Sequence, residues 1–196
     1  MAKLKISEMT GKLAGVAGIN TNPLTNSFCQ KKQLGNSICK DCYSCAMLRG
    51  IRKNCEPAWE RNSVLLSTTD LEASDIPYIP NALVRFHAHG ELINKRHFRN
   101  FIRIAEANPQ SKFSFFTKRT ELCELTSLPA NVTMVYSNPT INRVRNTPPK
   151  GFHKVFNVVT KDGYEINCGA KNCSRCQQCF NRGGSQVMIE KLKKRG

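Results

Sequence analysis

Four cysteines in the second half of the chain have the residue type and spacing that most clearly point to chemistry. Cys168, Cys173, Cys176 and Cys179 follow the pattern C-x4-C-x2-C-x2-C. Thiolates two residues apart can surround one polynuclear metal centre, while backbone N–H groups bond to the sulfurs. Zinc sites more often use two separated C-x2-C pairs. The spacing therefore predicts an iron–sulfur cluster, taken as [4Fe-4S], with zinc or unligated thiols as the alternatives.

A second, less regular group of cysteines lies nearer the N-terminus. Cys39, Cys42 and Cys45 are two residues apart, with Cys29 before them and Cys55 after them. Cys39, Cys42 and Cys45 are predicted to supply three metal ligands, with Cys29 or Cys55 as the fourth. They either build a second cluster or donate a ligand to the first. We expect the two cysteine groups to be close in space, because loops from both chain ends can share one end of a sheet.

Polar residues that follow predicted strands form a further candidate site. His87, His89 and Glu91 come directly after an apolar run, at the strand end where parallel α/β proteins place ligands. Arg85, His87 and His89 alternate, which predicts that they share one face of the strand. Lys118 follows the next predicted strand at an equivalent place. These side chains are expected to line a pocket or surround the metal. The alternative is a structural pair of hydrogen-bonded histidines.

Four further residues near these motifs carry simpler expectations. Gly90 is predicted to let the backbone turn sharply beside a ligand or the metal. Cys123 lies outside both cysteine groups and is predicted to be a buried free thiol. His97 and His153 are expected at the surface.

The charge of the chain favours polyanionic partners. Thirty Lys and Arg residues against fourteen Asp and Glu give a net charge of +16 over 196 residues. Such an excess attracts nucleic acid, although it can equally act as a solubility device or compensate an anionic cluster. The predicted contacts are Arg119, Arg143, Arg145, Lys193 and Lys194. There is no apolar run of membrane-spanning length and no signal-peptide pattern, so a cytosolic protein with reduced thiols is expected, in the host cytosol if the protein is viral.

The elements that must position these residues follow an α/β pattern. Strands are predicted at residues 81–87, 112–117, 131–136 and 154–160, with a possible first strand near residues 12–19. Helices are predicted from residue 56, at residues 95–107 and, briefly, at residues 121–126, and the last nine residues are predicted as a helical turn or a frayed end. Strands that alternate with helices imply parallel β-α-β units.

Chain length limits the architecture that these elements can build. An eight-stranded barrel usually needs about 250 residues. We therefore predict a single domain over residues 1–196, a reduced or incomplete TIM-like barrel of four to six strands. Residues 29–55 are expected to form a cysteine-rich loop at one chain end, and residues 168–180 a cysteine-rich motif at the other.

With these segments in place, the sequence resembles the phage "gene product 88" family. The resemblance rests on Cys42-Tyr43, Arg61-Asn62, Arg85-Phe86-His87 with Gly90-Glu91, Phe115-Phe116-Thr117-Lys118, and Asn167-Cys168-Gly169-Ala170 with Cys173, Cys176 and Cys179. It implies an iron–sulfur protein with a barrel-like α/β fold distantly like radical S-adenosylmethionine enzymes. The resemblance does not imply a particular activity. The chain departs from the pattern in having one residue fewer between Cys39 and Cys42 and in the additional Cys45. Because the C-x3-C-x2-C run of radical enzymes is missing, cluster-dependent radical chemistry is the less favoured alternative, and a zinc-stabilised interaction module is another.

Overall fold

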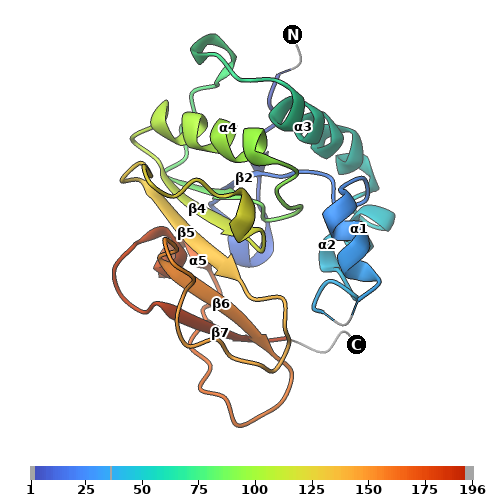
Figure 1. The fold of residues 1–196 in the computed structure, drawn as a ribbon, viewed down its shortest axis with the longest axis vertical. Coiled ribbons are helices and arrows are strands. Elements are labelled where there is room, and N and C mark those ends of the chain that lie inside the picture. The colour runs from blue at the N-terminus through green and yellow to red at the C-terminus, as the bar shows by residue number, and fades with distance from the viewer. Residues whose placement is uncertain (1–2, 36, 193–196) are drawn as a thin grey trace.

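The computed structural model describes residues 3–35 and 37–192. It contains one seven-stranded sheet with the strands in sequence order (Figure 1). The strands are β1 (Ser7–Glu8), β2 (Ala17–Ile19), β3 (Leu83–Phe86), β4 (Lys112–Thr117), β5 (Val132–Ser137), β6 (Lys154–Val159) and β7 (Val187–Lys191). The helices are α1 (Ser27–Gln33), α2 (Tyr43–Arg49), α3 (Glu56–Thr68), α4 (Lys95–Glu106) and the single turn α5 (Cys173–Cys176).

The sheet is parallel except at one edge. β1 pairs with β2 in the antiparallel sense, and every pair from β2–β3 to β6–β7 is parallel. β1 and β7 are the two edges, so the sheet does not close on itself. The predicted α/β class with parallel strands is therefore confirmed. The TIM-like barrel is not: this is an open sheet.

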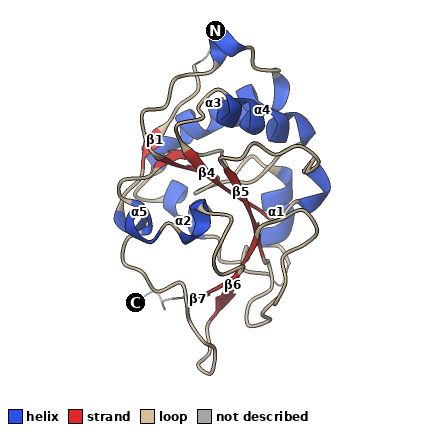
Figure 2. Ribbon diagram, turned by 90° about the vertical axis from the view of Figure 1, so that its left-hand side faces the viewer, coloured by secondary structure: helices blue, strands red, loops and turns tan. Residues whose placement is uncertain are grey.

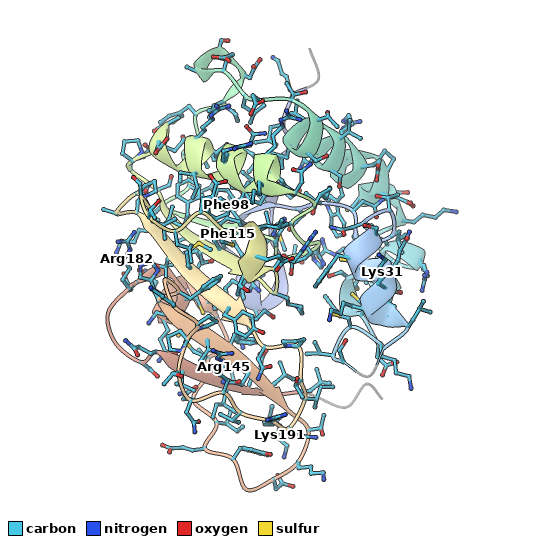
Figure 3. The ribbon with its side chains drawn as sticks, in the orientation of Figure 1. Lys31, Phe98, Phe115, Arg145, Arg182 and Lys191 are labelled. Atoms are coloured by element: carbon cyan, nitrogen blue, oxygen red, sulfur yellow. The ribbon has the colours of Figure 1, made fainter. Side chains whose placement is uncertain are left out.

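Helices α3 and α4 cover one face of the sheet and bury the largest apolar cluster (Figures 1 and 2). Asn94 caps α4 by accepting a hydrogen bond from the backbone N–H of His97. The helix then places Phe98 and Phe101 on its buried side, where Phe98 stacks on Phe115 of β4 at 5.5 Å between ring centroids. Figure 3 shows this pair between the helix and the strand. The i, i+3 spacing of apolar residues thus forms the interface that the sequence predicts.

The opposite face of the sheet is covered mainly by the cysteine-rich segment between β6 and β7. Val16 and Leu83 pack there against Phe180, which is only 4% exposed. Phe116, Val135 and Met188 form a neighbouring cluster, and Cys179 contacts both clusters. Lys154, a fully buried residue of β6, fixes the return of this segment towards β7, because its ammonium donates to the carbonyls of Gly183 and Ser185.

Several local predictions were wrong. Residues 29–55 are not an irregular loop, since they contain most of α1 and all of α2. Residues 187–191 form β7 instead of a helical turn, because β6 offers them a free parallel edge. The short helix expected at 121–126 is a 3-10 turn at Thr120–Leu122. His97 is fully buried beneath the sheet end and not at the surface. Among the described residues, no helix is long and apolar enough to cross a membrane.

Gly90, in the loop after β3, packs against the segment that follows β2. Its φ is +94°, and an added Cβ would lie 2.1 Å from the hydroxyl oxygen and 2.5 Å from the carbonyl oxygen of Thr21. The close approach that the sequence predicts is therefore to the neighbouring backbone of Thr21, whose N–H also donates a hydrogen bond to the carbonyl of His89.

We expect Gly90→Ala to destabilise the protein more than Gly163→Ala. Both glycines have φ near +90°, but a Cβ on Gly163 meets no atom within 4 Å. The backbone strain is thus common to both variants, and only Gly90→Ala adds overpacking, which typically costs about 1–3 kcal/mol. Chemical denaturation of the two variants measures this difference in the free energy of unfolding. Equal losses would show that the contact with Thr21 relaxes freely.

Candidate metal centre

The C-terminal cysteines all line one cavity. The cavity measures about 30 Å³ and is lined by Cys168, Cys173, Cys176 and Cys179, together with Lys12, Arg85 and Ser114. Asn172 caps α5 by accepting from the N–H of Arg175, and Gln177 ends it in the left-handed conformation, with φ 53°. This tight turn brings thiols that are close in sequence round to the same side.

Two polar groups of the sheet, from residues that line this cavity, have no hydrogen-bond partner. The Nε of Arg85 and the hydroxyl of Ser114 are buried and make no hydrogen bond. Arg85 and Ser114 are register partners on β3 and β4, so they sit side by side. The ammonium of Lys12 adds a third donor, 3.4 Å from the Sγ of Cys168, and also pairs with Glu190. Donors of this kind hydrogen-bond to cluster sulfurs and thiolates in iron–sulfur proteins, so the donor set fits such a group.

Three N-terminal cysteines line a second cavity, of about 150 Å³, at the carboxyl ends of the parallel strands. Cys29, Cys39 and Cys42 form one wall. Glu91 and Lys118, from the ends of β3 and β4, are among the residues of the opposite wall. This is the position at which open α/β sheets place their ligands. Neither Cys45 nor Cys55 is among the residues that line this cavity.

Cys45 lowers the pKa of Cys42 through a hydrogen bond between the two thiols. The thiol of Cys45 and the backbone N–H groups of Ser44 and Cys45, in the first turn of α2, lower the pKa of Cys42 to about 6. The same interaction, together with burial, raises the pKa of Cys45. Burial also raises the pKa of Cys29, with further increases from the negative charges of Glu91, Cys42 and Cys39. Cys42 is therefore the thiolate that this group holds ready at neutral pH.

The four C-terminal thiols also affect one another. Burial, together with the charges of the other three cysteines of its group, raises the pKa of Cys179 to about 12, while the cation of Arg85 opposes this increase. Deprotonating all four thiols together therefore requires additional positive charge in the cavity. Among the described residues, no three His, Cys, Asp or Glu side chains are arranged to hold a single metal ion.

Glu91 is fully engaged by the sheet end. Its carboxylate accepts from the hydroxyl of Thr117 at 2.5 Å, from the N–H of Lys118 at 2.8 Å and from the N–H of Leu92 at 2.9 Å. The carboxylate therefore ties the end of β4 to the loop that follows β3. The ammonium of Lys118 extends to Ser137 at 3.0 Å and lines the cavity.

The two histidines take different positions. His87 has φ 57°, which breaks the alternation of β3, and its ring packs edge-on against Phe101 at 4.9 Å on the α4 side. Burial lowers its pKa to about 3. His89 stacks on Trp59 at 4.5 Å, and its Nδ1 lies 2.9 Å from the Ser44 hydroxyl. The prediction that these histidines share a face with Arg85 was wrong. The left-handed backbone of His87 ends the alternation of β3, so the His87 ring packs on Phe101 of α4 while Arg85 packs on Phe116.

His87 contributes to the wall of the N-terminal cavity, whereas His89 is not among its lining residues. Arg85 was expected near the metal or pocket together with the two histidines, whereas Ser114 and Lys12 were not predicted as site residues. Ser114 carries no motif, and Lys12 is 156 residues from the cysteine that it contacts. A signal existed only for Arg85, as a charged residue inside a predicted strand.

The predicted nucleic-acid contacts are scattered. The guanidinium of Arg119 donates to the carbonyls of Leu92 and Ile93 and pairs with Glu121, so it is committed within the fold. Arg143 and Arg145 are exposed in the loop between β5 and β6. Lys193 and Lys194 lie outside the described residues.

We expect His89→Phe to flatten the acid side of the stability curve. Burial, helped by the cations of Arg52 and Arg85, lowers the pKa of His89 to about 4. The unfolded state, with a pKa near 6.5, therefore binds more protons between pH 6.5 and 4, and stability falls as the pH drops through this window. Phenylalanine keeps the stacking on Trp59 and removes the titration. Parallel curves of unfolding free energy against pH for the two proteins would contradict the assignment.

Comparison with known proteins adds one finding. No curated protein and no solved structure matches the chain. The family model described as Gene product 88 matches residues 2–195, which is nearly the whole chain. The protein is therefore a member of the Gene product 88 family, the phage family that its cysteine and strand motifs resemble.

Proposed function

We propose that this protein binds iron–sulfur clusters of the [4Fe-4S] type, one at each cysteine group, and works in redox. The observation that carries the proposal is the composition of the C-terminal cavity. Four thiols line it together with the buried, unpartnered Nε of Arg85 and hydroxyl of Ser114. Leaving such donors unsatisfied costs about 1–3 kcal/mol each, and thiolate or sulfide acceptors would satisfy them.

The residues around the C-terminal cavity have definable tasks. Phe180, Phe116 and Met188 exclude water from the sheet side of the cysteine segment. Lys12 and Arg85 offset the negative charge of the thiolates. A bound cluster would accept or donate single electrons at this position. Burial beneath apolar side chains and donor hydrogen bonds are the means by which a protein sets the potential of such a group.

The N-terminal cavity supports a second centre. Cys29, Cys39 and Cys42 supply three thiols, and Lys118 supplies a cation that lowers the pKa of each of them. Cys45 donates to Cys42 from behind. A zinc ion in place of iron is the alternative that metal analysis separates from the proposal, and a cluster-dependent reaction in this cavity is the alternative that a cofactor requirement would reveal.

Protein purified without oxygen is expected to be brown and to contain iron with acid-labile sulfide. Two [4Fe-4S] centres give about eight iron atoms per chain and one centre gives about four. Cys176→Ser should remove the iron of the C-terminal centre and lower the melting temperature, because metal binding and folding are coupled. Cys123→Ser is the matched control, because the thiol of Cys123 donates to the carbonyl of Arg119 and lines neither cavity. This variant should keep all the iron. Colourless protein with stoichiometric zinc would rule out the proposal, since Zn²⁺ is d¹⁰.

We further propose that the basic surface contacts nucleic acid without sequence preference. The loop of residues 138–150 contains Arg143, Arg145 and Lys150 and has no Asp or Glu. Figure 3 places Arg145 on this loop, beside β6 and away from α3 and α4. Arg145 is partly held by the carbonyl of Thr147, and its guanidinium lies 5.5 Å from the ring centroid of Tyr136.

The double variant Arg143→Gln/Arg145→Gln should bind duplex DNA more weakly, to a similar degree for unrelated sequences. The dependence of log affinity on log salt should lose about one unit of slope for each phosphate contact removed. Arg96→Gln is the control, because Arg96 already pairs with Asp70 at 3.0 Å. Fluorescence anisotropy over a range of salt concentrations measures both quantities. An unchanged slope would show that this loop does not touch phosphates.

A further inference from the structure

Arg85 lies where the two cysteine-lined cavities meet. Of the residues that the structure describes, it is the one that lines both of them. It belongs to β3, inside the sheet, and its side chain projects to the face opposite α4, where its guanidinium carbon lies 3.8 Å from the ring centroid of Phe116. The aromatic ring covers one side of the guanidinium and so holds its plane in place.

The guanidinium has no carboxylate partner. No ion pair found in the described parts of the chain includes Arg85, and its Nε is buried without a hydrogen bond. The acidic groups whose charges act on it are Cys179, Cys173, Glu190 and Cys168, and Glu190 is already paired with Lys12. A buried cation is costly unless an anion compensates it. Thiolates are thus the anions available to it.

Other cations near the cysteines each serve one cavity. Lys12 lines the C-terminal cavity and contacts Cys168, whereas Lys118 lines the N-terminal cavity and lowers the pKa of its cysteines. Of the three cations compared, Lys12, Lys118 and Arg85, it is Arg85 that lines both cavities.

We propose that Arg85 is a shared electrostatic link between the two centres, a positioning residue whose single charge raises the reduction potential of both. The inference rests on the proposed iron–sulfur function and adds how its two sites are coupled. Reduction adds one electron to a centre and no proton, so a nearby cation stabilises the reduced form more than the oxidised form. The charges of Cys179, Cys173 and Cys168 act on Arg85 from the C-terminal cavity, and Cys42 lines the N-terminal cavity that Arg85 also lines.

The test is a redox titration of the anaerobically loaded full-length protein, with dithionite as the reductant and electron paramagnetic resonance as the readout. Arg85→Met removes the charge, and Arg85→Lys retains it. Lys118→Met and Lys12→Met are matched single-cavity controls. We expect Arg85→Met to lower both potentials by an amount equivalent to a tenfold change in each reduction equilibrium, about 59 mV for a one-electron couple. Lys118→Met should lower only the N-terminal potential, and Lys12→Met only the C-terminal one.

The outcomes separate the inference from the function on which it rests. Wild-type protein without iron overturns the proposed function. If both centres are loaded and Arg85→Met moves the potential of one or neither, the inference is overturned and the function is left intact. Iron for a single centre overturns the inference and, with it, the second centre of the proposed function. Arg85→Gln is a second neutral variant that keeps N–H donors, so equal shifts in Met and Gln assign the effect to charge. If these variants lose iron, loss from both centres with retention in Arg85→Lys supports the link, and loss from one contradicts it.

Discussion

A parallel sheet has to be covered on both faces, because its backbone and its apolar side chains are excluded from water on each side. Here α3 and α4 cover one face, and within residues 3–35 and 37–192 no long helix covers the other. The crossover from β6 to β7 takes that position, with Cys179 and Phe180 packed on the apolar side chains of β3, β4 and β5. The cysteine-rich segment is therefore part of the core, and the sheet depends on it.

This arrangement explains the polar residues of that layer. The buried Nε of Arg85 and the buried hydroxyl of Ser114 would weaken an ordinary apolar interface, since each is left without a hydrogen-bond partner. Against a segment of four thiols, the same donors face groups that become anionic when they bind metal. The fold and the proposed centre thus depend on each other. The segment covers the sheet well only if its thiolates compensate the charge of Arg85, and its thiols ionise only if Arg85 and Lys12 offset the negative charge that results.

Sequence reasoning succeeded where one local pattern determined the structure. The apolar runs of β3 to β6 and the period of α4 identify buried elements without tertiary information. It failed for β7, whose mixed Ile, Glu and Lys residues become a strand only beside β6, and for α1, where Phe28 lies among polar residues with no clear apolar face. The position of Arg85 between two cavities could not be predicted without the register of β3 with β4. The turn of His87 away from the strand's alternation depends on its left-handed backbone, which no local motif indicates.

The start of the cysteine segment has a consequence for association between molecules. Asn167 lies along the free edge of β7: its side chain donates to the carbonyl of Val187 and accepts from the N–H of Ile189, whose carbonyl receives the N–H groups of Asn167 and Cys168. An uncovered edge strand is a template for a strand from another chain. The residue beside Cys168 thus covers the edge of the sheet, and displacing it would expose the backbone of β7 to a strand from another chain.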